Sequence, residues 1–307
     1  MRSVSVSLFC GCWTLLVVCG QEVTTELPPS INFSEASSLI AEPITVEVSC
    51  SEIAATLRDT IDGVAPILKT GLVYDGPITL SKSTTLRVLA TFDDQIVSQD
   101  SAAYLLADDD LLGFGSNLPL IVIDSFDFNI DNHARGNSQS EKRPVFALFL
   151  DIDDTSGRSK IRSAANFAGR AGMRVRGQTS TMFPKKQYSF EVWDETNNYP
   201  STSLLGFPKE SDWVQHAPFS DKTLMCNVLA YLLFREMGHY AAGCKYVELF
   251  YNADDGTVGI DDYRGIYILM EKIKLDKNRL AISKLDETMV EAPEITGGYI
   301  FKKDKGT

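Results

Sequence analysis

The chain contains few histidines and cysteines for its length. Its 307 residues include three histidines, His133, His216 and His239, which lie far apart in the sequence. A histidine-based metal site or a Ser-His-Asp triad therefore has little to build on. The six cysteines form no Cys-x-x-Cys pair, which excludes the usual zinc and thioredoxin patterns.

Basic residues are also scarce relative to acidic ones. The chain has 29 Lys and Arg against 41 Asp and Glu, a formal net charge of -12. This balance argues against a nucleic-acid backbone as the main partner, since such binding depends on an excess of Lys and Arg. Hydrophobic residues make up 44% and charged residues 23%, which is typical of a globular protein, and the length allows two domains.

The one long apolar run lies at the N-terminus. Arg2 precedes an apolar run from Val4 to Val18, and no further charge occurs before Glu22. A short positive region followed by an apolar region predicts a secretory signal peptide over residues 1–21, with Gly20 as a small residue for cleavage. The run is short for a membrane-spanning helix, and no membrane span is expected after cleavage.

This leader predicts a secreted or cell-surface protein. Cys19 raises the idea of a lipoprotein, for which Val18 is a poor match to the small residue expected before it. Cleavage would leave three cysteines, Cys50, Cys226 and Cys244. The last two could form a disulfide in an exported protein, and free buried thiols are the alternative.

Short alternating segments follow a polar stretch. Residues 22–41 are expected to form a linker, in which Pro28 and Pro29 stand side by side. Residues 42–107 contain several strand-like segments separated by Gly- and Pro-containing turns, and residues 84–91 (TTLRVLAT) are the clearest of them. Regularly spaced short strands predict a small β-sandwich.

Residues 57–106 (LRDTIDGVAPILKTGLVYDGPITLSKSTTLRVLATFDDQIVSQDSAAYLL) make up most of this region. They resemble the chitobiase C-terminal-like β-sandwich domains found on secreted bacterial enzymes. The usual role of such modules is structural spacing, so the resemblance implies no ligand site. The aromatic residues Tyr74, Phe92 and Tyr104 are expected in the core rather than on a sugar-binding surface.

The remainder, residues 118–307, combines strand and helix patterns. Strands are predicted at residues 118–123, 144–151, 245–251, 265–270, 280–285 and 298–302. A helix is predicted over residues 222–237, with Ser220 or Asp221 as its N-cap and a stop signal at Gly238. Its apolar stripe consists of Leu224, Val228, Leu229, Leu232, Leu233 and Met237. This order predicts an α+β lobe with an antiparallel sheet and one long helix.

An acidic cluster, Asp151, Asp153 and Asp154, follows the second of these strands. Such a cluster can bind Ca²⁺ or Mg²⁺, but the Gly and Glu that complete an EF-hand loop are missing. A solvated turn is therefore expected here, and no metal ligand is predicted in the chain.

Residues 170–193 (RAGMRVRGQTSTMFPKKQYSFEVW) predict a hairpin with a basic loop. Met173 and Val175 alternate with arginines, Gly177 opens a polar loop, and Lys186 begins a second strand. Backbone N–H groups, hydroxyls and basic side chains in such a loop can hold a polyphosphate. Spacing alone favours an ordinary hairpin with exposed basic residues, because short loop motifs often match by accident.

The wider order of elements changes that balance. A phosphate-binding hairpin, a lysine on the next strand, a helix and two strands ending in an acidic hinge form the layout of a protein-kinase N-terminal lobe. The standard signatures G-x-G-x-x-G, V-A-I-K, H-R-D and D-F-G are absent. Four segments of residues 173–305 nevertheless resemble, in order, the CotH family of atypical kinases, first met as a spore coat protein. They are MRVRGQTSTMFPKKQYSFEV, SDWVQHAPFSDKTLMCNVLAYLLFREMGHYAAGCKYVELFYN, YRGIYILMEKIKLDKNRLAISKL and TGGYIFKKDK.

The resemblance implies a kinase that uses ATP and Mg²⁺ to phosphorylate Ser or Thr of a secreted or surface protein. By position, the loop that covers the phosphates would include Arg176, Gly177, Thr179 and Ser180. Lys186 would pair with the phosphates as a point charge on a strand, and Lys185 competes for this assignment. The alternative for Lys186 is a solvent-facing strand lysine.

Two glutamates are further candidates from the resemblance. Glu236, late in the predicted helix, would be the ion-pair partner of that lysine, and a surface glutamate fits equally well. Glu271, at the end of GIYILME, would lie at the hinge that approaches the adenine, or it would cap or pair locally. Asn227 and Arg279 are expected to be structural. The family usually has Arg where this chain has Cys226, which puts a charge role at that position in doubt.

The catalytic residues themselves are not assigned. In this family the substrate-orienting and metal-binding aspartates lie in a C-terminal lobe, in motifs resembling N-x-D and W-D-F-D. The chain stops at Thr307, before the region in which they would lie, so the catalytic residues are expected beyond it and the chain is expected to be a fragment.

Other classes of function stay open. The same lobe could serve as a scaffold in a non-catalytic coat or cell-surface assembly protein, because extracellular ATP is scarce. A carbohydrate-associated protein is suggested by the β-sandwich alone. The predicted fold class is thus α+β, with a small β-sandwich followed by a protein-kinase-like N-terminal lobe at residues 118–307.

Overall fold

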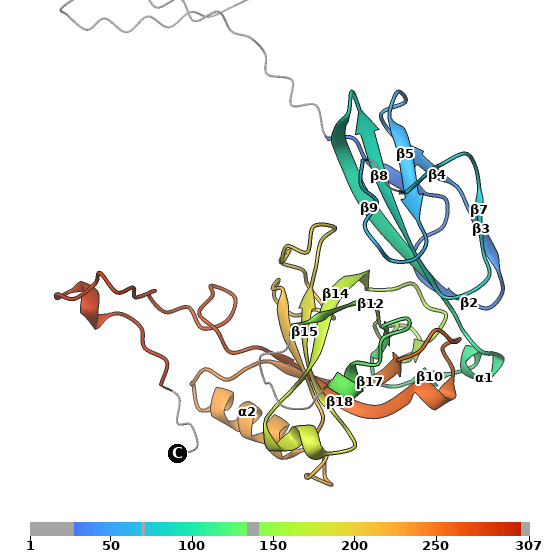
Figure 1. Cartoon of the computed structure of the whole chain (residues 1–307). Helices are drawn as coiled ribbons and strands as arrows, with labels where there is room; N and C mark the ends of the chain where they lie inside the picture. The colour runs from blue at the N-terminus through green and yellow to red at the C-terminus, as the bar shows by residue number, and fades with distance from the viewer. Residues whose placement is uncertain (1–27, 69–70, 134–140, 302–307) are drawn as a thin grey trace, which may run out of the picture.

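The computed structural model describes residues 28–68, 71–133 and 141–301. It shows a predominantly β chain in which a β-sandwich-like unit precedes a barrel (Figure 1). The predicted signal peptide, residues 1–21, and the start of the predicted linker lie outside the described residues. Within the described part, no helix is long and apolar enough to cross a membrane.

The first unit is built around two long antiparallel strands, β8 (Thr84–Phe92) and β9 (Gln95–Leu106). Successive side chains of a strand point to opposite faces, and Leu86, Val88 and Ala90 enter the core on one face of β8, as predicted. The main sheet has the order β2-β9-β8-β5-β6, beside the pairs β1-β4 and β3-β7. The other strands are β1 (Ile31–Phe33), β2 (Ser38–Ile40), β3 (Ile44–Val46), β4 (Val48–Cys50), β5 (Thr56–Thr60), β6 (Leu72–Val73) and β7 (Ile78–Leu80).

This unit begins earlier than the sequence predicts. β1 and β2 lie in the expected linker, and Ile31 and Ile40 are buried in the core. Each strand has three residues, too few to show a periodicity. Of the aromatic residues expected in the core, Tyr104 is fully buried, whereas Phe92 is 41% exposed at the end of its strand. Tyr74 is half-buried, and its hydroxyl accepts a hydrogen bond from the Val48 N–H.

The second unit is a closed barrel with the strand order β11-β12-β14-β15-β16-β18-β17. Its neighbouring strands are antiparallel except β11 and β17, which run parallel and close the barrel. The strands are β11 (Leu120–Asp124), β12 (Arg143–Leu150), β14 (Phe167–Arg176), β15 (Gln187–Val192), β16 (Asp212–His216), β17 (Cys244–Asn252) and β18 (Tyr263–Glu271). Short elements flank them: α1 (Asp109–Leu112), β10 (Gly115–Ser116), β13 (Ser159–Lys160), η3 (Ile260–Asp262) and η4 (Glu294–Thr296).

Both faces of the first barrel strands are buried, which explains their continuous apolar sequences. Along β12, Val145 and Phe149 point into the barrel, whereas Phe146 and Leu148 point outward. The outward side chains pack with Leu105 of the sandwich and with α1. A strand covered on both sides has little reason to alternate between apolar and polar residues.

The antiparallel sheet that the sequence predicts is closed into a barrel by the parallel pair β11 and β17. The predicted strands at residues 118–123, 144–151, 245–251 and 265–270 correspond to β11, β12, β17 and β18. The predicted strands at residues 280–285 and 298–302 do not form within the described residues. The pairing that closes the barrel joins Leu120 to Glu248, residues too distant in sequence for a local pattern to reveal.

The predicted long helix is α2 (Cys226–Glu236), shorter than expected at its N-terminal end. It ends before Gly238, whose φ of +83° confirms the predicted stop. It packs on the outside of β16 and β18 through Val228 and Tyr231. The rest of the predicted apolar stripe is exposed: Leu229, Leu232, Leu233 and Met237 have between 45% and 68% of their surface accessible.

Two sequence expectations concern side chains away from the core. Cys50, Cys226 and Cys244 are free thiols, but Cys226 is exposed rather than buried. Asp153 accepts a hydrogen bond from the Ser156 N–H at 2.7 Å, so the acidic cluster forms a solvent-exposed turn as predicted.

Candidate functional site

One end of the barrel carries the loop with the predicted phosphate-binding residues. Residues 177–186 join β14 to β15 there and include η2 (Thr179–Met182). The segment after β11, with η1 (Ile130–His133), covers the same end. The Tyr188 hydroxyl donates to Asp131 Oδ1 at 2.7 Å, and the Ile130 N–H donates to the Tyr251 hydroxyl at 2.9 Å. Burial raises the pKa of Tyr251 to about 12, so this hydroxyl stays protonated.

Gly177 shapes the hairpin loop. Its φ of +106° lies in the region that favours glycine, and a Cβ there would stand 2.0 Å from Ser180 Oγ. The turn leaves Arg176, Gly177 and Thr179 exposed and Ser180 half-buried. An exposed arginine beside hydroxyls and backbone N–H groups is suited to an anion.

The two adjacent lysines have different environments. The Lys186 ammonium donates to the Thr181 carbonyl at 2.7 Å and therefore lies across the hairpin loop. The Lys185 ammonium donates to the Ile266 carbonyl at 2.6 Å and lies 4.7 Å from the centre of the Tyr267 ring. Burial lowers the pKa of Lys185. Lys186 is thus the lysine that the structure places at the loop.

The hairpin loop also contacts the segment that leads into α2. The Phe183 ring stacks on the Phe219 ring with centroids 5.0 Å apart. Two residues later, Asp221 Oδ2 accepts the Cys226 N–H, at the first residue of α2, at 2.8 Å. The N-cap residue is Met225, so the predicted N-cap at Ser220 or Asp221 is wrong because the helix begins later than expected. Hydrogen bonds from Thr223 and Cys226 lower the pKa of Asp221.

A histidine that the sequence analysis regards only as isolated connects the hairpin to α2. His216 Nδ1 lies 2.9 Å from Gln187 Oε1, and His216 Nε2 lies 2.9 Å from Asn227 Nδ2. Gln187 is the strand partner of Arg176. Burial and the positive charge of Arg176 lower the pKa of His216, which favours a neutral ring with a proton on Nδ1. No sequence spacing indicates this contact, because it crosses three separate elements.

Neither of the two predicted glutamates, Glu236 and Glu271, pairs with Lys186. Glu236 is exposed in the last turn of α2, and the structure gives it no ion pair with Lys186. Glu271 binds Arg279 Nη1 through Oε1 at 2.7 Å and accepts the Gly243 N–H through Oε2 at 2.7 Å. The side chain of Glu271 therefore pairs locally with Arg279, whose guanidinium also lies over the Trp213 ring.

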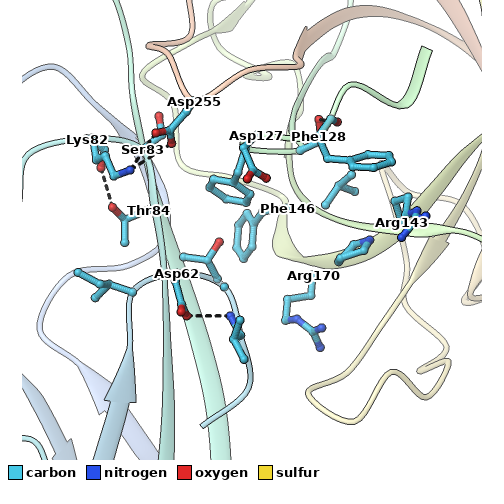
Figure 2. A pocket seen from close by; sticks show the side chains of 18 residues that line it. Asp62, Lys82, Ser83, Thr84, Asp127, Phe128, Arg143, Phe146, Arg170 and Asp255 are labelled. Atoms are coloured by element: carbon cyan, nitrogen blue, oxygen red, sulfur yellow. Dashed lines mark hydrogen bonds and ion pairs between the residues drawn. The ribbon is translucent and has the colours of Figure 1, made fainter. Parts of the chain in front are cut away.

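A cleft of about 470 Å³ lies where the sandwich meets the barrel (Figure 2). Its sandwich wall comes from residues 61–64 and 82–85, and its barrel wall from residues 125–128 and 143–146 with Arg170 and Asp255. No sequence pattern indicates this cleft, because its walls come from two domains.

Two ion pairs connect the domains around the cleft. Arg87 of the sandwich binds Glu195 at 2.9 Å, with both side chains largely buried. The Ser101 hydroxyl donates to the same carboxylate at 2.5 Å. Lys82 binds Asp255 at 2.9 Å, but both of these side chains are more than half exposed. The domains therefore meet through one buried and one exposed ion pair.

Comparison with known proteins matches both units. Residues 173–305 match the family described as CotH kinase protein, and residues 35–102 match the chitobiase/β-hexosaminidase C-terminal domain. The first match contains the hairpin, α2, β17 and β18, and it begins after β11 and β12. No curated protein matches the chain. The chain thus contains a region similar to the CotH kinase protein family at residues 173–305, preceded by a region similar to the chitobiase/β-hexosaminidase C-terminal domain at residues 35–102.

Proposed function

We propose that the chain is exported and supplies the nucleotide-binding part of a CotH-type protein kinase. The hairpin would bind the phosphates of ATP, and the enzyme would transfer a phosphoryl group to Ser or Thr of a secreted or surface protein. The family match supports a kinase-like protein. The observation that carries ATP binding is the position of the Lys186 ammonium across the Gly177 loop, 2.7 Å from the Thr181 carbonyl.

The hairpin residues suit a polyphosphate by charge and shape. Arg176 is exposed at the end of β14, and a side chain at position 177 would meet Ser180. The Ser180 hydroxyl therefore lies close to the Gly177 backbone, and a phosphate bound at this loop could have its charge neutralised by Arg176 and Lys186. In phosphoryl transfer, such positioning and neutralisation account for much of the catalysis.

The described residues offer the phosphates of ATP several donors, but they offer Mg²⁺ no cluster of ligands. Among them, no group of three His, Cys, Asp or Glu side chains could hold a metal ion. Phosphate oxygens supply ligands to Mg²⁺ in many nucleotide sites, so the metal would arrive with the nucleotide.

Titration of the full chain with a fluorescent ATP analogue tests this proposal. Replacing Lys186 by Ala removes a charged hydrogen-bond donor and should weaken binding about tenfold to hundredfold. Lys185→Ala is the matched control, because that ammonium binds the Ile266 carbonyl, and its affinity should stay within about threefold of the wild type. Absence of binding by the wild type, or equal effects of the two variants, would overturn the proposal.

One observation favours the scaffold as a second candidate. Leu229, Leu232, Leu233 and Phe234 of α2, with Met237 at its C-cap, expose 45% to 68% of their surface. Clustered exposed apolar side chains often mark a protein-binding surface. A scaffold would keep assembling when Lys186 is replaced and would lose assembly when Leu232 and Leu233 become Glu. Light scattering of both variants separates the two functions.

A further inference from the structure

The positively charged side chains that line the interdomain cleft differ in whether another group of the protein pairs with them. The Lys82 ammonium is paired with Asp255, and Arg170 binds Asn197 Oδ1 at 2.8 Å as well as the Asp194 carbonyl. Arg143 differs: its guanidinium lies 4.7 Å from the centre of the Phe128 ring, and among the described residues no carboxylate pairs with it. An exposed guanidinium on an aromatic ring retains five N–H donors for a ligand.

The opposite wall of the cleft carries two aliphatic side chains among polar ones. Ile61 and Val64 line it from the turn between β5 and β6, although 54% and 62% of their surfaces are exposed. Figure 2 shows Asp62 on this wall, where its carboxylate accepts the Val64 N–H at 3.1 Å. A ligand that covers these two aliphatic side chains would remove their apolar surface from water, which is favourable.

The aromatic residues of the cleft do not provide an open ring face. Phe146 is 1% exposed, and the Phe128 ring carries the Arg143 guanidinium. Phe126 is half-buried against the cluster that joins the two domains. Sugar recognition depends on a flat ring on which the sugar can stack. The cleft is therefore better suited to aliphatic side chains beside a carboxylate than to a carbohydrate.

We propose that this cleft binds an extended peptide segment in which aliphatic side chains precede an acidic one. The aliphatic side chains would pack against Ile61 and Val64, and the acidic side chain would pair with Arg143. The carboxylates of Asp62 and Asp127 accept hydrogen bonds only, so they would face backbone N–H groups of the peptide. The cleft volume of about 470 Å³ is within the range of small-ligand sites.

The cleft lies near the hairpin, so a peptide bound in the cleft would lie near the proposed phosphate-binding loop. Arg143 is the strand partner of Met173, three residues before Arg176 on β14. At about 3.3 Å per residue, the two arginines are separated by about 10 Å along the strand. The interpretation that the peptide belongs to the phosphorylated protein rests on the proposed function. Peptide binding itself does not, because it requires no nucleotide.

Fluorescence anisotropy with three labelled peptides tests the proposal on the full chain without nucleotide. The peptides carry Leu-Leu-Glu, Leu-Leu-Lys or Ser-Ser-Glu between Gly-Ser flanks. We expect the Leu-Leu-Glu peptide to bind at least about tenfold more tightly than either of the others, because both the charge and the aliphatic groups contribute. Arg143→Glu should reverse the order of the two Leu-Leu peptides.

Matched variants separate this site from general charge effects. Val64→Asp should weaken binding of the Leu-Leu-Glu peptide, and Arg162→Glu, an exposed position outside the cleft, should leave it unchanged. Arg143, Val64 and Arg162 are all exposed, so variants at these positions should fold. Equal affinities for the Leu-Leu peptides, or no response to Arg143→Glu, would overturn the proposal. Binding of an N-acetylglucosamine tetrasaccharide that Arg143→Glu abolishes would assign the cleft to carbohydrate instead.

Discussion

The buried ion pair between Arg87 and Glu195 should dominate the coupling of the two domains. Glu195 binds the Nε and Nη2 groups of Arg87 at 3.1 and 2.9 Å. The two side chains are 7% and 17% exposed. Glu195→Ala would leave a buried guanidinium without its carboxylate, which is among the more destabilising changes a single substitution can make.

The structure sets the expected size of this effect. Loss of one partner of a buried ion pair costs about 3 to 5 kcal/mol. Arg87 would keep the Glu195 backbone carbonyl at 2.9 Å and the Gly63 carbonyl at 3.3 Å, so the lower end applies. A loss of about 3 kcal/mol corresponds to a decrease in melting temperature of about 6 to 12 °C on the scale of domains of about 150 to 250 residues.

The exposed ion pair between Lys82 and Asp255 supplies the matched control. It also connects the domains, but its side chains are 63% and 55% exposed. Asp255→Ala should therefore cost less than about 1 kcal/mol. Differential scanning calorimetry of the wild type and both variants measures the two effects. Equal shifts for Glu195→Ala and Asp255→Ala would refute the argument that burial, rather than position between the domains, determines the coupling.

Three further predictions concern the hairpin and α2. Gly177→Ala, at a φ of +106°, should destabilise the chain by about 1 to 2 kcal/mol and weaken binding of the ATP analogue, as thermal melting and titration will show. Because the folded state lowers the pKa of His216, the wild type should lose stability relative to His216→Gln as the pH falls below about 6.5, and melting at about pH 7.5 and about pH 5.5 tests this sign. Leu233→Ala, at a residue 54% exposed, should change the free energy of unfolding by less than about 0.5 kcal/mol, whereas Phe190→Ala in the barrel should cost about 3 to 5 kcal/mol in denaturant titrations.

Local sequence patterns predicted those elements that bury one face and expose the other. β8 shows alternation because one of its faces lines the sandwich core. β14 and β15 are predicted with their loop because a glycine and a proline bound it. By contrast, α2 shows an apolar stripe at helical spacing, yet only part of that stripe touches the barrel. Periodicity indicates which side chains are apolar, and it cannot show whether a partner covers them.

Contacts between distant segments account for what the sequence did not predict. The parallel pairing of β11 with β17 closes the barrel, and no turn or spacing links these strands. The link from Gln187 through His216 to Asn227 joins residues from two strands and a helix. The resemblance to the CotH family points to Lys186 or Lys185, and the contacts of their ammonium groups in the fold distinguish the two lysines.

Hydrogen–deuterium exchange of the full chain with and without ATP tests the central claim most directly. Backbone N–H groups of residues 176–187 should exchange more slowly when ATP is present, because the phosphates would occupy the Gly177 loop. Lys186→Ala should remove this protection at the same ATP concentration, and Lys185→Ala should preserve it. Unchanged exchange at the hairpin, or protection that appears only elsewhere in the chain, would contradict the assignment of the hairpin as the phosphate-binding site.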